Sequence, residues 1–209
     1  KPFTNRLTIA PVLDDAGEMQ VAINDMALVE ALTPKVLAER HRDLDDALAW
    51  VVDANLSDSA LAHLFESAGN GRIICAEPVS AIKATKLRPW LQRISLLKPN
   101  RMEAVALTGL DEDCAASDLA TALHQQGVER VVISLGRDGI YGSDMDGTIF
   151  TQASYPVSIQ SVTGAGDTLM AALVDTFLAG QALSEALPWA QAAATLSLKS
   201  ARAIHPGLC

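Results

Sequence analysis

The sequence predicts an α/β fold, a parallel, doubly wound sheet with helices on both faces. Short, continuous apolar runs such as AWVV, RIICA, ISLL and RVVISL alternate with helical segments along the chain. Unbroken runs of this kind are typical of parallel strands that are covered on both faces. The chain has 209 residues, of which 49% are hydrophobic and 20% charged, and this length is enough for one sizeable core. Disorder and low complexity are therefore excluded.

The first predicted element is a β-hairpin. Apolar residues alternate along 7–13 and again along 19–23, and the acidic, glycine-containing segment 14–18 predicts the turn between them. Because two strands alone are only marginally stable, the hairpin either packs on the later domain or belongs to a sheet whose other strands are absent. Thr33 and Pro34 then predict the start of a helix.

The rest of the chain alternates between strands and helices. The parallel strands are predicted at 47–52, 72–76, 94–97 and 130–135. The helices between them are predicted at 57–68, 80–92, 100–108 and 116–126. Antiparallel strands around 140–143 and 148–151 follow, and then two alanine-rich helices at 165–179 and 184–201.

Charge and cysteine content exclude several classes of function. Sixteen Lys and Arg residues against 25 Asp and Glu residues give a formal net charge of −9, the wrong sign for wrapping nucleic acid or anionic lipid. No window approaches the roughly 18 consecutive apolar residues of a membrane span. Cys75, Cys114 and Cys209 form no CxxC pair, so we expect a cytoplasmic protein without a zinc site. From the charge and the hydropathy we expect neither a nucleic-acid partner nor a membrane.

Polar or turn-forming residues follow each predicted parallel strand. In order along the chain they are Asp53 and Asn55, Glu77 and Pro78, Lys98 to Asn100, and Gly136. Ligands of open α/β sheets bind outside the carboxyl ends of the strands, so we expect these groups to face a common cleft. Taken singly, each of them is an ordinary turn or cap residue.

The sharpest motif is the run Thr163-Gly164-Ala165-Gly166-Asp167, which leads into an apolar helix face. Two glycines at a helix entrance let backbone amides converge on one point, where the helix N-terminus favours an anion such as phosphate. Asp167 has two readings: a carboxylate that is favourable in a first helical turn, or a general base for phosphoryl transfer to a hydroxyl. A dinucleotide-binding GxGxxG is not formed, and no Gly-Lys pair exists for a Walker A loop.

Four segments together resemble a known family. VTGAGD at 162–167, followed by its alanine-rich helix, is similar to the second signature of the ribokinase-like, or PfkB-type, carbohydrate kinases. KPNRME at 98–103, SLGRDG at 134–139 and WAQAAATLSLKSA at 189–201 agree with that family in order and spacing. Within the family, GEMQVAINDM, AEPVS and VTGAGD are most similar to the branch that phosphorylates pseudouridine.

The resemblance implies roles for the glycine motif. Asp167 would take the proton from a sugar hydroxyl, and the amides of Gly164, Ala165 and Gly166 would neutralise charge that develops on the transferred phosphoryl group. The reaction would be ATP-dependent phosphorylation of a sugar or nucleoside hydroxyl, with the 5'-hydroxyl of pseudouridine as the favoured acceptor. Ribose, fructose or a purine nucleoside is the alternative substrate, and a non-catalytic nucleotide-binding or interaction module is the alternative of another class.

The resemblance also implies sites for ATP and Mg²⁺. Asn100 and Glu103 match an NxxE element in which Glu103 organises Mg²⁺ and its waters, although Glu103 alone would read as a solvated helix carboxylate. The residues that would contact ATP are Asn100, Ser134, Gly136, Gly139, Gly166 and Gln191. Ser161 stands where many members carry the Asp of a monovalent-cation site, and this departure puts K⁺ activation in question.

The largest departure from the family lies at the beginning of the sequence. Family members begin with a strand that ends in a substrate-binding Asp and with a Gly-Gly-Asn segment that grips the sugar, and neither occurs here. The opening hairpin resembles lid strands from mid-chain, so about a third of a complete kinase domain is expected to be missing. We therefore expect a lid remnant at 1–33 that could join two copies, an ATP-binding and catalytic α/β domain at 34–209, and no activity of the 209 residues alone.

Overall fold

The computed structural model describes residues 9–13, 19–24, 27–200 and 205–208. Contacts divide the chain into two compact units, which are described separately. The first comprises Lys1–Ala47 and Asn55–Gly69, and the second comprises Leu48–Ala54 and Asn70–Cys209. The predicted division at residue 33, into a lid hairpin and an α/β domain, stays a prediction.

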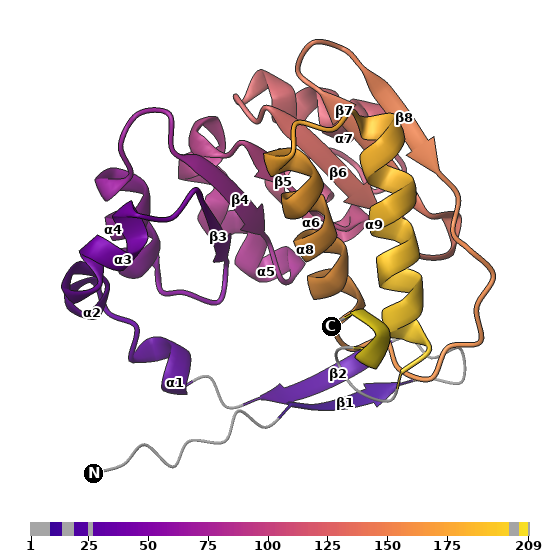
Figure 1. Ribbon diagram of the computed structural model, residues 1–209, viewed down its shortest axis with the longest axis horizontal. Coiled ribbons are helices and arrows are strands. Elements are labelled where there is room, and N and C mark those ends of the chain that lie inside the picture. Colours follow the sequence, from indigo (N-terminus) through magenta and orange to yellow (C-terminus); the bar gives the residue numbers. More distant parts are fainter. Residues whose placement is uncertain (1–8, 14–18, 25–26, 201–204, 209) are drawn as a thin grey trace. The chain divides into compact units, whose positions relative to one another are not determined.

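The second unit contains a sheet of six strands in the order β3-β4-β5-β6-β7-β8 (Figure 1). The strands are β3 (Ala49–Asp53), β4 (Ile73–Glu77), β5 (Leu96–Leu97), β6 (Arg130–Ser134), β7 (Ile140–Asp144) and β8 (Ile149–Gln152). The first four pair in parallel, whereas β7 and β8 extend the sheet in antiparallel fashion. The predicted mostly parallel sheet is confirmed.

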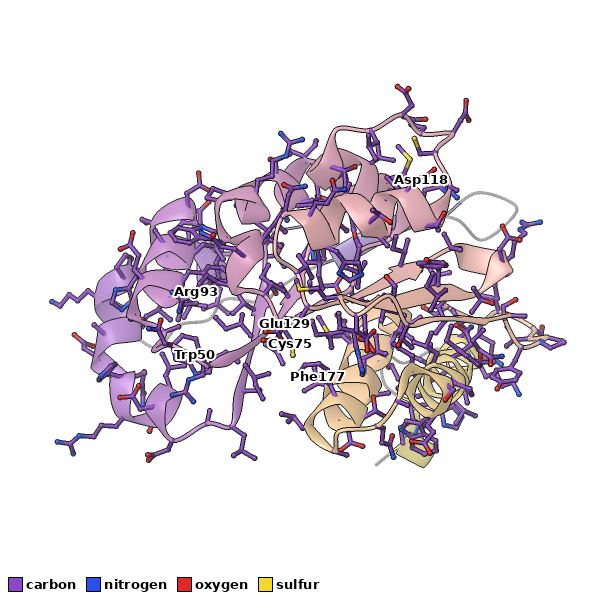
Figure 2. The ribbon with its side chains drawn as sticks, turned by 90° about the horizontal axis from the view of Figure 1, so that it is seen from above. Trp50, Cys75, Arg93, Asp118, Glu129 and Phe177 are labelled. Atoms are coloured by element: carbon purple, nitrogen blue, oxygen red, sulfur yellow. The ribbon has the colours of Figure 1, made fainter. Side chains whose placement is uncertain are left out.

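Helices of this unit cover both faces of the sheet, as predicted (Figure 2). One face carries α5 (Ala81–Ala84), the 3₁₀ helix η1 (Thr85–Arg93), α6 (Arg101–Thr108) and α7 (Ala116–Gln125). The other face carries α8 (Ala165–Leu178) and α9 (Leu183–Leu198), and the short 3₁₀ helices η2 (Gly136–Asp138) and η3 (Pro206–Leu208) complete the unit. The single helix predicted at 80–92 is wrong, because Pro89 lacks an amide donor and the chain winds as a 3₁₀ helix around it.

A single apolar cluster joins α8 and α9 to the sheet. Cys75, Leu96, Val132 and Ile140 from four strands pack with Leu169, Met170 and Leu173 of α8 and with Leu183 and Leu187 of α9. Gly142 of β7 permits the close approach of α9, because a Cβ built there would lie 2.7 Å from Leu187 Cδ1. The packing fixes α8 against the strands whose ends carry the polar residues.

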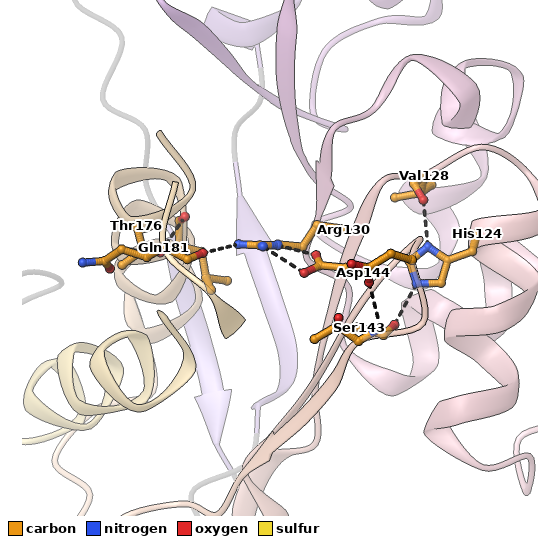
Figure 3. Close-up of polar contacts among 10 residues, drawn as sticks. His124, Val128, Arg130, Ser143, Asp144, Thr176 and Gln181 are labelled. Carbon is orange, nitrogen blue, oxygen red and sulfur yellow. Dashed lines mark hydrogen bonds and ion pairs between the residues drawn. The ribbon is translucent and has the colours of Figure 1, made fainter. Parts of the chain in front are cut away.

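Arg130, at the start of β6, fastens the sheet to the turn that follows α8 (Figure 3). Its Nε and Nη2 donate to the two carboxylate oxygens of Asp144 at 2.6 and 3.0 Å, and its Nη1 donates to the carbonyl of Gln181 at 3.2 Å. A bidentate Arg–carboxylate pair holds both side chains in one geometry. The far end of α8 is thereby tied to β6 and β7.

His124 of α7 makes a second polar link to β7 (Figure 3). Its Nδ1 lies 2.8 Å from the carbonyl oxygen of Val128, and its Nε2 lies 2.8 Å from Ser143 Oγ. A carbonyl only accepts, so Nδ1 carries the proton, and in the neutral ring Nε2 accepts from the Ser143 hydroxyl. This pair of the buried Ser143 and the half-buried His124 is a packing contact between helix and sheet.

The described residues of the first unit form the two strands of the predicted hairpin and four helices. β1 (Ile9–Leu13) and β2 (Met19–Asn24) pair in antiparallel fashion, which confirms the two strands, whereas the predicted turn at 14–18 lies outside the described residues. The helices are α1 (Ala27–Glu30), α2 (Pro34–Glu39), α3 (His41–Asp45) and α4 (Asp58–Ser67). Thr33 caps α2 by accepting from the Val36 amide at 3.4 Å, so the predicted helix start is confirmed.

Candidate active site

The polar residues that follow the parallel strands lie along one edge of the sheet. Asp53 at the end of β3 pairs in register with Glu77 at the end of β4. Further along, Asn100 forms an isolated parallel bridge with Ser134, whose amide donates to the Pro99 carbonyl at 2.9 Å. These four strand ends are therefore aligned, as the sequence predicts; Asn55 belongs to the first unit.

Helix α8 begins with the glycine motif. Gly164 is its N-cap, with φ 86° and ψ −7°, a left-handed conformation that favours glycine. Asp167 is the third residue of the helix and is exposed. Within the described part of the chain, the amides of Gly166 and Asp167 have no acceptor, as is usual for the first N–H groups of a helix. They are free to bind an anion.

Lys98 connects the strand edge to this helix start. Its side chain is 5% exposed, and its Nζ lies 2.7 Å from Oε2 of Glu77, which is 16% exposed. The contact is a close ion pair without the alignment of a hydrogen bond. A Cβ built at Gly166 would lie 3.4 Å from Lys98 Nζ, so the ammonium stands beside the first turn of α8.

The carboxyl groups around Lys98 influence one another. Burial raises the pKa of Glu77 to about 7; the Lys98 charge opposes this rise, whereas the carboxylates of Glu103 and Asp167 add to it. Burial also raises the pKa of Glu103, against the Asn100 amide and the Lys98 charge, which lower it. Four ionisable groups from two strand ends and the first turns of α6 and α8 therefore form one electrostatic cluster, which we call the Lys98 cluster: Glu77, Lys98, Glu103 and Asp167.

Asn100 and Glu103 form a capping box at the start of α6. The Glu103 amide donates to Asn100 Oδ1 at 2.9 Å, and the Asn100 amide donates to Glu103 Oε2 at 2.8 Å. The Glu103 residue is 3% exposed, which corrects the reading of this side chain as a solvated helix carboxylate. Its second oxygen takes no part in the cap.

The segment between β6 and β7 contains the predicted nucleotide loop. Gly136 and Gly139 have φ 60° and 94°. A Cβ at Gly139 would lie 2.0 Å from the Gln152 carbonyl oxygen, so the backbone there passes too close for any side chain. Ser134 ends β6 beside Asn100, so the structure brings two of the predicted ATP contacts together. Gln191 is buried on α9 and is 7% exposed, and no hydrogen bond among the described residues joins it to that pair.

Sequence reasoning placed Glu77 and Lys98 at strand ends but gave them no role. The signal was the position of a single charged residue directly after each of two apolar runs. Sequence reasoning also missed Val79, which has φ 70° in a tight turn closed by the Ser80 amide and the Pro78 carbonyl at 2.8 Å. A positive φ at a β-branched residue is strained, and such strain gathers at functional sites.

A single magnesium ligand suits this site better than a preformed cage. Among the described residues, no group of three or more His, Cys, Asp and Glu side chains could hold a metal ion. Mg²⁺ keeps several waters and is bound through one or two carboxylates together with substrate phosphates. The free oxygen of the Glu103 carboxylate fits that requirement. Among the described helices, none is long and apolar enough to cross a membrane.

Sequence comparisons with known proteins identify one family. The family described as pfkB family carbohydrate kinase matches residues 4–208. Pseudouridine kinase of Escherichia coli (strain K12) is 37% identical over 211 residues, with 99% of this chain and 66% of the relative covered. Ribokinase of Haemophilus influenzae is 28% identical over 155 residues, with 73% of this chain and 49% of the relative covered. The chain thus spans between about half and 66% of the length of these relatives.

Solved structures give the same picture of the fold. A putative sugar kinase from Clostridium perfringens has a TM-score of 0.79 at 27% identity, over 96% of this chain and 63% of its own. Ribokinase from Thermotoga maritima has a TM-score of 0.76 at 19% identity, over 91% of this chain and 62% of its own. The ribokinase-like fold is therefore confirmed, and the chain belongs to the pfkB family of carbohydrate kinases.

Proposed function

We propose that this chain supplies the ATP-binding and phosphoryl-transfer part of a kinase that phosphorylates the 5'-hydroxyl of pseudouridine. The observation that carries the proposal is the position of Asp167, in the first turn of α8 between free backbone amides and close to the carboxyl edge of the parallel strands. The 37% identity to a pseudouridine kinase over nearly the whole chain supports this acceptor. Ribose is the second candidate, because the ribokinase relative covers 73% of the chain.

Asp167 would act as the general base. Its exposed carboxylate can accept the proton of the acceptor hydroxyl as the hydroxyl oxygen attacks the γ-phosphorus of ATP. The amides of Gly164 and Gly166 would donate to the transferred phosphoryl group, and the Ala165 amide would join them by leaving its long contact with the Val162 carbonyl at 3.4 Å. The dipole of the helix terminus favours the negative charge of this group. Positioning and electrostatic stabilisation are the main tasks of a protein in phosphoryl transfer.

The strand edge would hold the nucleotide. Asn100, Ser134, Gly136, Gly139 and Gln191 are the proposed ATP contacts, and Glu103 would hold Mg²⁺ through its free oxygen. The metal would supply positive charge that neutralises the phosphates. Ser161, the residue that argues against K⁺, accepts a hydrogen bond from the Thr163 amide at 3.1 Å through its own Oγ.

We do not expect the 209 residues alone to turn over pseudouridine. The family features that grip the sugar do not occur in this sequence, and the chain covers 66% of the E. coli enzyme. The activity assay should therefore use the complete open reading frame that contains this chain. MgATP binding, in contrast, can be measured on the 209-residue chain by calorimetry.

ATP consumption should be measured with pseudouridine, uridine, ribose, fructose and adenosine as acceptors. Asp167→Asn should abolish phosphoryl transfer, because the amide cannot take the proton of the acceptor hydroxyl. The affinity for MgATP should stay within about twofold of the wild-type value, because the proposed ATP contacts are unchanged. Asp175→Asn, which removes an exposed carboxylate from the last turns of the same helix, is the matched control and should keep full activity. Normal turnover by Asp167→Asn would refute the base assignment. Faster turnover of ribose would favour the second candidate, and ATP binding without any transfer would indicate a non-catalytic module.

A further inference from the structure

The candidate site contains a buried cation that the mechanism above does not use. The Lys98 side chain is 5% exposed at the end of β5, although lysine is rarely buried unless it is paired. Its partner within the described part of the chain is the Glu77 carboxylate, at 2.7 Å. An ammonium has three N–H donors, and one carboxylate oxygen does not satisfy them all. Lys98 therefore keeps donor capacity for another acceptor.

The ammonium lies beside the first turn of α8. Nζ would lie 3.4 Å from a Cβ at Gly166, so the glycine lets the helix start come close to the ammonium without a side chain between them. The free amides of Gly166 and Asp167 belong to the same turn. A buried cation and two free amides that meet at one helix start form a site for an anion with several oxygens, and a phosphoryl group has this chemistry.

The surrounding charges show why an anion would need this lysine. Glu77, Glu103 and Asp167 bring three carboxyl groups into the Lys98 cluster, against one ammonium. A phosphoryl group that approaches Asp167 would meet repulsion from these carboxylates unless a cation stood next to it. A buried ion pair is also weak evidence for stability, because apolar residues of similar volume pack at least as well. A binding role explains the pair better than a purely structural one.

We propose that the Lys98 ammonium binds an oxygen of the phosphoryl group at the start of α8 and that Glu77 is a positioning residue that holds this ammonium in place. The inference rests on the proposed function, since it takes ATP as the source of the phosphoryl group. Glu77 attracts the Lys98 ammonium from the end of β4 at 2.7 Å and so keeps Nζ beside Gly166. Lys98 therefore binds ATP through its charge and takes no part in proton transfer.

Calorimetric titration of the 209-residue chain with MgATP and with adenosine tests this inference. Lys98→Met should weaken ATP binding roughly 10- to 100-fold, the effect of losing one charge-assisted hydrogen bond. Adenosine has no phosphate, and its affinity should stay within about twofold. Lys98→Arg keeps the charge and should retain most of the preference for ATP over adenosine. Arg72→Met removes one positive charge about 16 Å away, at the opposite end of β4, and should leave ATP affinity unchanged.

Two further variants separate binding from folding. Lys98→Met alone leaves Glu77 buried without a partner, so the double variant Glu77→Gln, Lys98→Met provides a neutral pair and should melt like the wild type while showing the same loss of ATP binding. Glu77→Gln alone should weaken ATP binding several-fold and also lower the melting temperature, because the buried ammonium loses both its anchor and its counter-ion. Glu77→Asp keeps a carboxylate and should restore part of that affinity.

The outcomes distinguish the two proposals. ATP affinity within twofold of wild type in the folded double variant, or an equal loss for adenosine, would overturn the role of Lys98 alone. If Glu77→Gln affected the melting temperature but not ATP affinity, its positioning role would be wrong. Absence of ATP binding by the wild-type chain would overturn this inference together with the proposed function.

Discussion

Asn100 and Glu103 cap each other across the first turn of α6, with amide-to-side-chain distances of 2.9 and 2.8 Å. The same glutamate is the proposed magnesium ligand, so a structural and a chemical role fall on one side chain. A glutamine at position 103 can still accept from the Asn100 amide, because capping boxes use Glu or Gln at this place. The two roles can therefore be separated by experiment.

Glu103→Gln should keep the stability of the chain within about 0.5 kcal/mol and weaken Mg²⁺-dependent ATP binding at least tenfold, whereas Glu103→Ala should also lose about 1 kcal/mol through the missing cap. Urea denaturation gives the stabilities, and titration of ATP with and without Mg²⁺ gives the metal dependence. Equal ATP affinities for the wild type and Glu103→Gln in Mg²⁺ would show that the ligand lies elsewhere.

Glu77 should make stability depend on pH. Its pKa is about 7 in the folded chain against an ordinary value of 4.5, so the folded state holds an extra proton between these two pH values. The free energy of unfolding therefore falls as the pH rises through this range, by about 3 kcal/mol between pH 4.5 and pH 7. Glu77→Gln cannot titrate and should remove this part of the slope. Denaturation curves at pH 5, 6 and 7 test the prediction, and parallel slopes for both proteins would contradict it.

The two glycines of the nucleotide loop should respond differently to alanine. At Gly136 a Cβ would meet no atom within 4 Å, so Gly136→Ala should cost only the conformational strain of a positive φ, about 1 kcal/mol. At Gly139 the Cβ would also collide with the Gln152 carbonyl, so Gly139→Ala should cost several times more. Chemical denaturation of the two variants side by side gives both values. Similar losses would mean that the loop can move away from β8.

The backbone strain at Val79 should be visible in the stabilities of its glycine and alanine variants. At φ 70° an alanine is still unfavourable and a glycine is not, so Val79→Gly should be more stable than Val79→Ala by about 1 kcal/mol. This order is the reverse of the usual effect of glycine on the unfolded chain. Thermal melts of both variants measure the difference, and the usual order would show that the turn relaxes without strain.

Local patterns explain which parts of the fold the sequence predicts. Continuous apolar runs marked the four parallel strands, and Thr33, Ser57 and Asn100 marked helix starts because each accepts from an amide three residues ahead. The short helices α1 and α3 were missed, because segments of four and five residues show no full helical period. The apolar spacing around Pro89 predicted one continuous α-helix. Proline lacks an amide donor, and the chain forms a 3₁₀ helix there instead.

The candidate site was only partly predictable, for a different reason. The glycine motif is one continuous stretch, and its residue pattern alone indicated a phosphate site. The NxxE segment is also continuous, but its role was predicted only through the resemblance to the kinase family. The Lys98–Glu77 pair depends on two strands that lie next to each other and on α8 returning to the same edge. Such a contact between distant segments is set by tertiary packing, and no local spacing encodes it.

The Arg130 link has a consequence for the edge of the sheet that carries the candidate site. Helix α8 begins beside Lys98 and is tied to Arg130 just beyond its end, and its 14 residues span about 21 Å. A helix is stiff over this length, so the contacts at its far end help to set where Asp167 lies relative to the strand ends. Arg130, at the start of β6, therefore influences the position of the proposed base from the opposite end of the parallel strands.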